Sequence, residues 1–308
     1  MIAVGFALLG AFSQALASVL HRMTNAADDG RRPLAETVRH LVRQPRWLLG
    51  TVAMAGTFVF TALALYFGTL ATVQPILVTE LIFTLALRAF WLHDTVPGRT
   101  WGAAGILCAG LFGFLVAARP QEGHGNPSAT AWVVALSTRG TVIAVLVLLS
   151  RWGSPARRAA LLGAAAGMMW ALDAAFVKAA TDALAADGWI GMLAHWPIYA
   201  VVVSGVAGTF LLEAAFAAGP LSASQSTLLI VDPLASIALG VELFGEQLSS
   251  SAVAITFQVV FLGVMFAGVV LLSRWAPPSM EAHGKRSPRT VPVGGPTPPG
   301  GAPPDDTT

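Results

Sequence analysis

The chain contains the sequence GPLSASQSTLLIVDPLASIALGVELFGEQL at Gly219–Leu248. Residues 221–242 of this stretch are apolar over a length that spans a bilayer at about 1.5 Å of rise per residue. Asp232 and Pro233 stand near its middle. A carboxylate is costly at that depth, and Pro233 lacks a backbone N–H, so we expect a helix break there. A broken helix with an acidic residue near the membrane midplane is typical of ion and substrate sites in carriers.

Composition sets the class of protein. Of the 308 residues, 55% are hydrophobic and only 11% are charged, and the mean hydropathy is +0.69. So few charged side chains cannot solvate a soluble globule of this size. The sequence therefore predicts an all-α integral membrane protein whose main partner is the lipid bilayer. The single cysteine, Cys108, excludes an intramolecular disulfide and a cysteine metal site.

Apolar segments long enough to cross a membrane occur nine times, at 2–20, 48–66, 71–91, 101–118, 131–150, 159–178, 197–217, 221–242 and 252–273. The first could instead be a cleaved signal peptide, because Ala15–Ala17 fits the cleavage pattern. The basic stretch Arg31–Trp47 has apolar residues at helical spacing, so we expect a helix on the membrane surface, with a solvated loop as the alternative.

Basic residues lie mainly in the loops on one side of this arrangement. The opposite side has only Arg119 and Lys178. The asymmetry predicts a multi-pass protein of the plasma membrane with its N-terminus outside and its C-terminus in the cytoplasm. The tail, residues 276–308, is rich in Pro and Gly, and we expect it to be disordered. The basic residues of the first side are Arg22, Arg31, Arg32, Arg39, Arg43, Arg46, Arg88, Arg99, Arg151, Arg157, Arg158, Arg274, Lys285, Arg286 and Arg289.

A unit of four spans occurs twice, in residues 1–118 and 159–275, with a linker carrying the fifth span at 119–158. The sequence Ala-Gly-Thr-Phe occurs in both units, at 55–58 and at 207–210. Because one extra span separates two units of four, the second unit must enter the membrane from the opposite face. We therefore expect two inverted repeats with a site between them. Further matched positions are Gln74 with Gln225, Glu80 with Asp232, Asp94 with Glu246, Gly105 with Gly263 and Gly110 with Gly268.

Two segments of the chain resemble the drug/metabolite transporter (EamA-like) superfamily. They are Gln74-Pro75 with its apolar continuation, and Gly219-Pro220-Leu221 through Phe244-Gly245-Glu246. The resemblance covers most of residues 1–275 and implies an alternating-access carrier. Usual members have ten spans as two fives, whereas nine spans are similar to the branch that includes magnesium transporters of the NIPA type.

Charged residues inside the spans are the candidate site. Glu80 and Asp232 lie near the span centres and correspond in the repeat, so we expect them to couple protons or bind a cation. The alternative is that each pairs with a buried partner and fixes helix register. Arg139, also near mid-span, is the expected ion-pair partner or, alternatively, an anion binder. Pro75 and Pro233 are the expected helix breaks.

Other polar residues form a second group of candidates. Asp173 and Glu213 lie about a turn from the ends of their spans, which favours snorkelling or a gate contact. Lys178, beside Asp173, is expected to anchor the helix at the outer interface. Gln74 and Gln225 either bond neighbouring helices or face a cavity. The paired glycines are expected to allow close helix approach.

Several protein classes have no sequence support. The motifs GxxxxGK[ST], HExxH and GxSxG are absent, so we predict no ATP motor, no enzyme and no cofactor. No nucleic-acid module is visible. The leading hypothesis is a secondary-active transporter that moves a small metabolite or drug by alternating access, coupled to protons or another ion. The alternatives are a magnesium or other divalent-cation transporter and a non-transporting scaffold or sensor. A homodimer is compatible with the sequence, and whether a metal binds is left open.

Overall fold

The computed structural model describes residues 1–25, 44–91, 93, 95–123 and 127–275. Regular structure in these residues is α-helical, with one isolated antiparallel bridge between Gln121 and Gln247. Within the described ranges, nine helical segments are long and apolar enough to cross a membrane. The predictions of an all-α protein and of nine spans are therefore confirmed. Asp94, the tail, and most of the expected surface helix at Arg31–Trp47 lie outside the described residues.

The bounds of the helices agree with the predicted spans, with one exception. The exception is the sixth span, expected at 159–178, which is part of a helix that continues to Ala194. It changes direction at Gly188, where φ is 69°. The helices are α1 (Ile2–Asn25), α3 (Pro45–Tyr66), α4 (Leu70–Leu77), α5 (Glu80–Trp91), α6 (Gly98–Ala118), α7 (Ala129–Leu149), α8 (Pro155–Ala194), α9 (Pro197–Ala218), α10 (Leu221–Phe244) and α11 (Ala252–Trp275).

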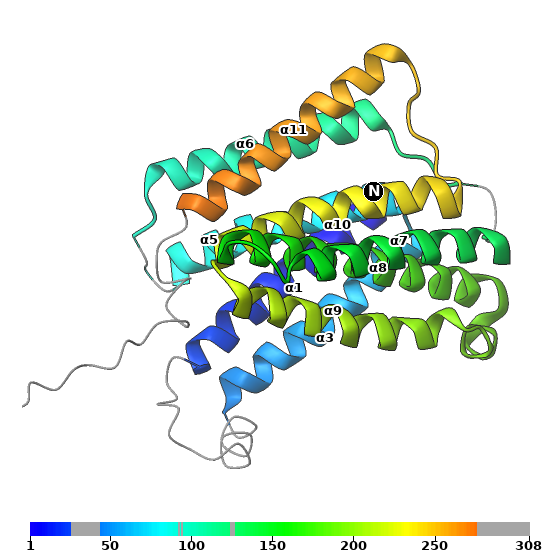
Figure 1. Ribbon diagram of the computed structural model, residues 1–308, viewed down its shortest axis with the longest axis horizontal. Helices are drawn as coiled ribbons and strands as arrows, with labels where there is room; N and C mark the ends of the chain where they lie inside the picture. The colour runs from blue at the N-terminus through cyan, green and yellow to red at the C-terminus, as the bar shows by residue number, and fades with distance from the viewer. Residues whose placement is uncertain (26–43, 92, 94, 124–126, 276–308) are drawn as a thin grey trace, which may run out of the picture.

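The helices lie in three groups (Figure 1). Helix α8 packs against both α9 and α10, with α7 beside them. Helices α6 and α11 form a pair on one side, while α1 and α3 pair on the other. The short helix α4 contacts both α1 and α10, which places it between the two halves of the chain.

Close approach of α6 and α11 depends on glycine. A Cβ at Gly110 would overlap the backbone of Met265, and one at Gly268 would lie 2.6 Å from the backbone nitrogen of Leu107. The expectation of close helix approach is therefore confirmed at these two positions. It is wrong at Gly105 and Gly263, where a Cβ would meet no atom within 4 Å. Five-residue spacing explains the difference, because it turns the two glycines of each helix onto different faces.

Of the two expected helix breaks, the structure has the one near Pro75 but not the one at Pro233. The third span is interrupted at Val78 and Thr79, shortly after Pro75, so that α4 and α5 are separate helices. Helix α10, in contrast, continues through Pro233, and the break expected there is wrong. Pro233 is fully buried, and α10 packs closely on α8, where a Cβ at Gly167 would lie 2.9 Å from the carbonyl oxygen of Leu228. Packing of this kind keeps a proline-containing helix continuous although one hydrogen bond is lost.

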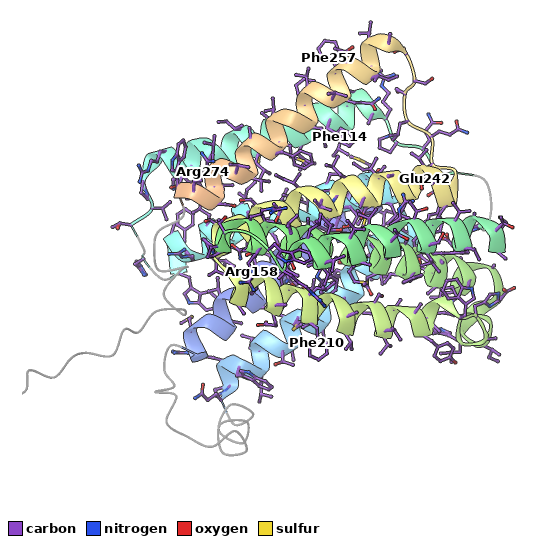
Figure 2. The ribbon with its side chains drawn as sticks, viewed as in Figure 1. Phe114, Arg158, Phe210, Glu242, Phe257 and Arg274 are labelled. Atoms are coloured by element: carbon purple, nitrogen blue, oxygen red, sulfur yellow. The ribbon has the colours of Figure 1, made fainter. Side chains whose placement is uncertain are left out.

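The outer faces of the helices are apolar. Phe210 of α9 is 73% exposed and Phe257 of α11 is 50% exposed, and both project away from the helices around them (Figure 2). Large apolar side chains that are exposed over many helices are stable against lipid and unfavourable against water. The fold therefore indicates a multi-pass membrane protein.

Candidate functional site

Three connections between helices meet at one end of the bundle, and we call residues 69–71, 118–123 and 244–249 the clasp. Gln121 and Gln247 exchange backbone hydrogen bonds of 2.9 and 3.1 Å, and the N–H of Ser249 donates to the carbonyl of Ala118 at 2.8 Å. A Cβ at Gly123 would overlap the carbonyl of Phe244. The clasp therefore joins the end of α6, the start of α4 and the end of α10.

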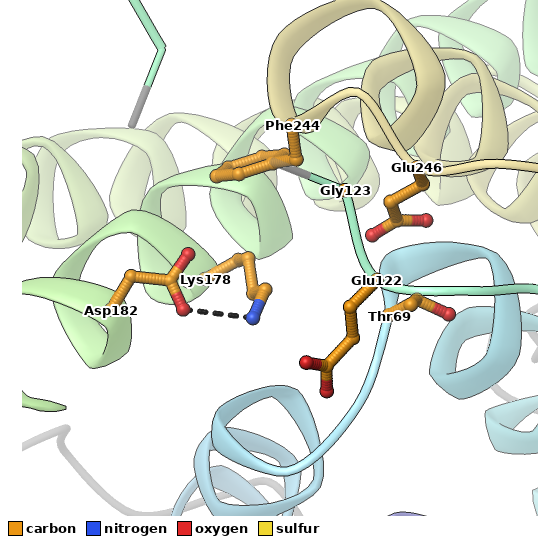
Figure 3. Close-up of a pocket in the computed structure, with 7 residues that line it drawn as sticks. All are labelled: Thr69, Glu122, Gly123, Lys178, Asp182, Phe244 and Glu246. Carbon is orange, nitrogen blue, oxygen red and sulfur yellow. Dashed lines mark hydrogen bonds and ion pairs between the residues drawn. The ribbon is translucent and has the colours of Figure 1, made fainter. Parts of the chain in front are cut away.

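A cavity of about 280 Å³ lies beside the clasp (Figure 3). Its walls carry three carboxyl groups and one ammonium group, so the lining has an excess of negative charge when all are ionised. The hydroxyl of Thr69 and the ring of Phe244 complete the described lining. The lining residues are Thr69, Glu122, Gly123, Lys178, Asp182, Phe244 and Glu246.

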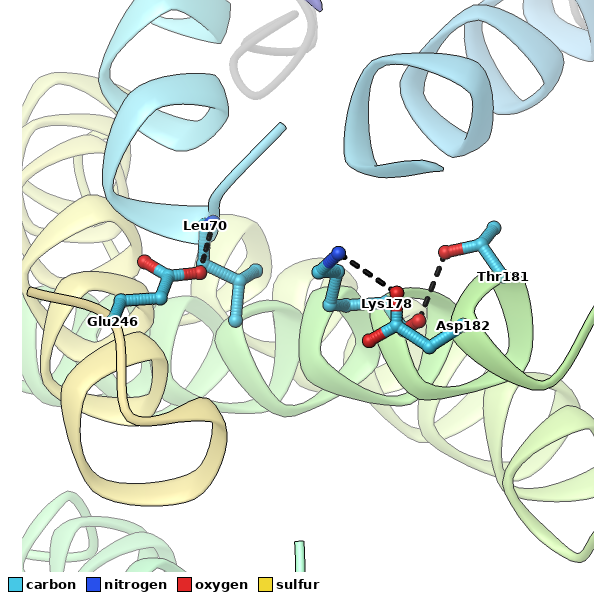
Figure 4. A network of polar contacts seen from close by, with 5 residues as sticks. All are labelled: Leu70, Lys178, Thr181, Asp182 and Glu246. Carbon is cyan, nitrogen blue, oxygen red and sulfur yellow. Dashed lines mark hydrogen bonds and ion pairs between the residues drawn. The ribbon is translucent and has the colours of Figure 1, made fainter. Parts of the chain in front are cut away.

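Glu246 is the best-satisfied carboxyl group of the cavity. Its side chain accepts hydrogen bonds from the backbone N–H groups of Leu70, at 2.6 Å, and Ala71, at 2.9 Å (Figure 4). These are the first two amides of α4, which have no partner within the helix. Burial raises the pKa of the Glu246 carboxyl group, while the amides of Ala71 and Leu70 and the nearby Lys178 act in the opposite direction. The residue is only 3% exposed.

Lys178 and Asp182 form an ion pair across the floor of the cavity. The Lys178 ammonium donates to the Asp182 carboxylate at 2.8 Å, and the two side chains are one turn apart on α8. Lys178 was expected to anchor the helix at the outer interface, beside Asp173, and the structure places it within α8, which extends beyond the predicted span to Ala194. Its ammonium group is largely buried and points into the cavity (Figure 3). The anchoring role stays a prediction.

A second polar group lies within the spanning helices. Glu80 is the first residue of α5 and Asp232 lies in the middle of α10. The carboxyl groups of Glu80 and Asp173 are near enough to Asp232 to interact with it electrostatically. Sequence analysis paired the first two residues and assigned Asp173 to a helix end, whereas α8 carries Asp173 into the bundle at 9% exposure.

Hydroxyl groups donate hydrogen bonds to two of these three carboxyl groups. Ser204 of α9 donates to Asp173 at 2.7 Å, and Ser236 donates to Asp232 at 3.2 Å. Within the described part of the chain, none of the three acidic residues forms an ion pair. The group therefore consists of three carboxyl groups from α5, α8 and α10 with no neutralising cation among the described side chains.

Arg139 does not supply that cation. It forms an ion pair of 2.6 Å with Glu242, near the end of α10, so its expected pairing with Glu80 or Asp232 is wrong. A long arginine side chain can reach along its helix toward the membrane interface, where charge is less costly. Figure 2 shows Glu242 close to the clasp end of α10.

The remaining candidate residues differ in burial and lie on different helices. Gln74 is buried at 5% exposure in α4, whereas Gln225 is partly exposed near the start of α10. Glu213 is exposed on α9, so it is not directed into the bundle. Among the described residues, no group of three or more His, Cys, Asp or Glu side chains is arranged to hold a metal ion.

Sequence reasoning missed several of these partners. The Lys178–Asp182 pair has a visible signal, since four-residue spacing places the two side chains on one helical face. The contact of Glu246 with α4 has no such signal, because it joins positions 176 residues apart. Arg88, counted with the basic side and placed at the end of the third span, is buried at 4% exposure in the last turn of α5.

The fold and the polar groups define a class, an α-helical multi-pass membrane protein with charged groups inside its bundle. The chain is similar to an uncharacterised protein of Corynebacterium glutamicum, with 28% identity over 292 residues, which cover 93% of this chain and 99% of the relative. No family model matches the chain. No solved structure matches it either.

Proposed function

We propose that the protein is a secondary-active transporter of the plasma membrane that moves a small molecule or ion by alternating access, coupled to protons or another cation. The observation that carries the proposal is the group formed by Glu80, Asp173 and Asp232 inside the spanning bundle. Carboxyl groups at membrane depth that form no ion pair with a described side chain are favoured as protonated groups or as ligands of a bound cation, and such residues mark ion pathways and proton relays.

The arrangement of the helices supports a duplicated fold. In the first repeat α1 packs on α3, and in the second α8 packs on α9 in the corresponding way. The pair α6 and α11 joins the last helices of the two repeats. We propose that the two repeats are inverted relative to each other. We also propose that the N-terminus lies outside and the C-terminus in the cytoplasm, because the distribution of basic loops favours that orientation. The clasp and its cavity then lie at the outer end.

The test is transport by the purified protein in proteoliposomes with an imposed pH gradient. A panel of amines, amino acids, sugars and Mg²⁺ would be compared for wild type, Glu80→Gln and Asp232→Asn. Glu213→Gln is the matched control, because it removes a carboxylate that is exposed on α9 and is not directed into the bundle. We expect gradient-dependent flux of a panel member that both central substitutions abolish and the control retains.

Other outcomes would replace this proposal. Flux of Mg²⁺ that needs no proton gradient would identify a cation transporter, which remains the alternative within the same class. If Glu80→Gln and Asp232→Asn lower the melting temperature while every flux stays at the level of empty liposomes, the scaffold alternative is favoured.

A further inference from the structure

Helix α4 connects the clasp to the carboxyl groups inside the bundle. It has eight residues, Leu70–Leu77, and is therefore roughly 12 Å long. The residues that follow, Val78 and Thr79, form a turn with three-residue backbone hydrogen bonds, and the Thr79 hydroxyl donates to the carbonyl of Ile76 at 2.7 Å. Glu80 begins the next helix. A rigid segment with a turn at one end can tilt as a unit.

The opposite end of α4 is held by groups from the clasp. Glu246 accepts from the amides of Leu70 and Ala71, and the Thr69 hydroxyl accepts from the amide of Thr72 at 3.1 Å. All three amides that begin the helix are therefore satisfied, and the two bonds to Glu246 come from the other half of the chain. A carboxylate is favourable at this position because the N-terminus of a helix carries partial positive charge.

Glu246 itself is held at the end of α10. Gly245 ends that helix in a left-handed conformation, with φ at 63°, and the N–H of Glu246 donates to the carbonyl of Gly240 at 3.0 Å. Gly240 also leaves space for the side chain, since a Cβ there would overlap the Glu246 carboxylate and lie 2.7 Å from its Cδ. The position of this carboxylate therefore depends on a glycine that lies six residues earlier in the chain.

We propose that Glu246 is a latch that holds α4 against the end of α10, and that its withdrawal lets α4 tilt and connects the cavity with Glu80. The role of the latch in transport rests on the proposed function. The latch itself is a property of the fold and can be measured without a substrate.

The surroundings of the clasp make withdrawal feasible. The cavity lies directly beside Glu246, so the carboxylate can move into a polar space where water replaces the two amides as hydrogen-bond partners. Lys178 lines the same cavity and can meet the displaced carboxylate (Figure 3). Because burial is the largest influence on the Glu246 carboxyl group, the closed position carries a desolvation cost that opening removes.

The experiment is hydrogen exchange followed by mass spectrometry on the full chain in lipid nanodiscs. Three variants are compared with wild type. Glu246→Gln replaces one acceptor oxygen by an NH2 group that cannot accept from an amide. Gly240→Ala displaces the carboxylate and keeps its charge. Glu122→Gln is the matched control, because Glu122 lines the same cavity but is exposed, and the first two amides of α4 donate to Glu246 instead.

We expect exchange in peptides covering 69–73, 118–123 and 244–249 to be roughly tenfold faster in Glu246→Gln and Gly240→Ala, since a helix cap contributes about that factor. Peptides of α3 and α9, and all peptides of Glu122→Gln, should exchange as in wild type. In wild type, peptides of the clasp should exchange faster than the peptides where α8 packs against α10.

Three results would overturn the latch: unchanged exchange at the clasp in both variants, faster exchange throughout the molecule, or a wild-type clasp as protected as the α8–α10 contact. The measurement is independent of any flux. A clasp that opens as expected in a protein that transports no member of the panel would keep the latch and reject the proposed function.

Discussion

The contact between α6 and α11 gives a quantitative prediction for stability. An alanine Cβ at Gly110 would lie 2.6 Å from the Cα of Met265, whereas ordinary contacts begin at 3.4 Å. The two helices must therefore separate by about 1 Å, and overpacking of this kind costs about 1–3 kcal/mol. Gly268→Ala should behave in the same way, because it meets the backbone of Leu107.

The same helices contain matched controls. Gly105→Ala in α6 and Gly263→Ala in α11 each place a Cβ in open space. Alanine is favoured over glycine in a helix by about 1 kcal/mol, so these two variants should be as stable as wild type or more stable.

The assay is unfolding of the purified protein in mixed micelles, followed by tryptophan fluorescence as the fraction of denaturing detergent rises. The expected order of unfolding free energies is Gly110→Ala and Gly268→Ala below wild type, with Gly105→Ala and Gly263→Ala at or above it. Equal losses for all four variants would refute the packing argument, because they would show that the glycines do not differ in their surroundings. An unfolding free energy of Gly110→Ala equal to that of wild type would also refute the packing argument.

Further predictions concern the carboxyl groups. Ser204→Ala removes the hydroxyl that donates to the buried Asp173 and should lower the unfolding free energy by about 1 kcal/mol. Ser204→Thr keeps a hydroxyl group and should retain most of the stability. An equal loss in both variants would contradict the hydrogen-bond explanation. The clasp should open more readily as pH rises. Burial raises the pKa of Glu246 above its ordinary value of 4.5 in the closed clasp. Protonation removes the desolvation cost of the closed position while both carboxyl oxygens can still accept from the amides of Leu70 and Ala71, which the NH2 of a glutamine cannot do. The stability of the closed clasp is therefore complete below 4.5 and is lost as pH rises through the raised pKa. Hydrogen exchange corrected for the intrinsic rate should show this dependence in wild type and not in Glu246→Gln, and a wild-type clasp that loosens toward acid would contradict it. The charged groups around Glu246 whose titration must be separated from it are Lys178, Asp182 and Glu122.

Much of the fold was predictable because its determinants are local. Nine apolar segments identify the spanning helices, since length and hydropathy are properties of a single segment. Pro75 likewise precedes a real interruption. Pro233 has the same local signal and causes no interruption. The difference is the packing of α10 on α8, which is not a local property.

The candidate site was less predictable because its contacts join distant helices. The sequence predicts Glu80 and Asp232 as a pair from a proposed repeat, and the structure places the two carboxyl groups near enough to interact. The place of Asp173 in this group was not predicted, because its depth in the bundle depends on how far α8 extends. The ion-pair partner of Arg139 was not predictable for the same reason. It is set by how α7 lies against α10 and not by the position of Arg139 in its own span.

We propose that solute movement is coupled to cations through Glu80 and Asp232. The most direct measurement is the internal pH of proteoliposomes, reported by a trapped dye, while an outward gradient of each panel solute is imposed. Wild type should show solute-driven proton movement that reverses with the gradient, and the double variant Glu80→Gln/Asp232→Asn should show none. Solute flux of equal rate in both proteins, with no movement of protons or Mg²⁺ in either, would contradict the account.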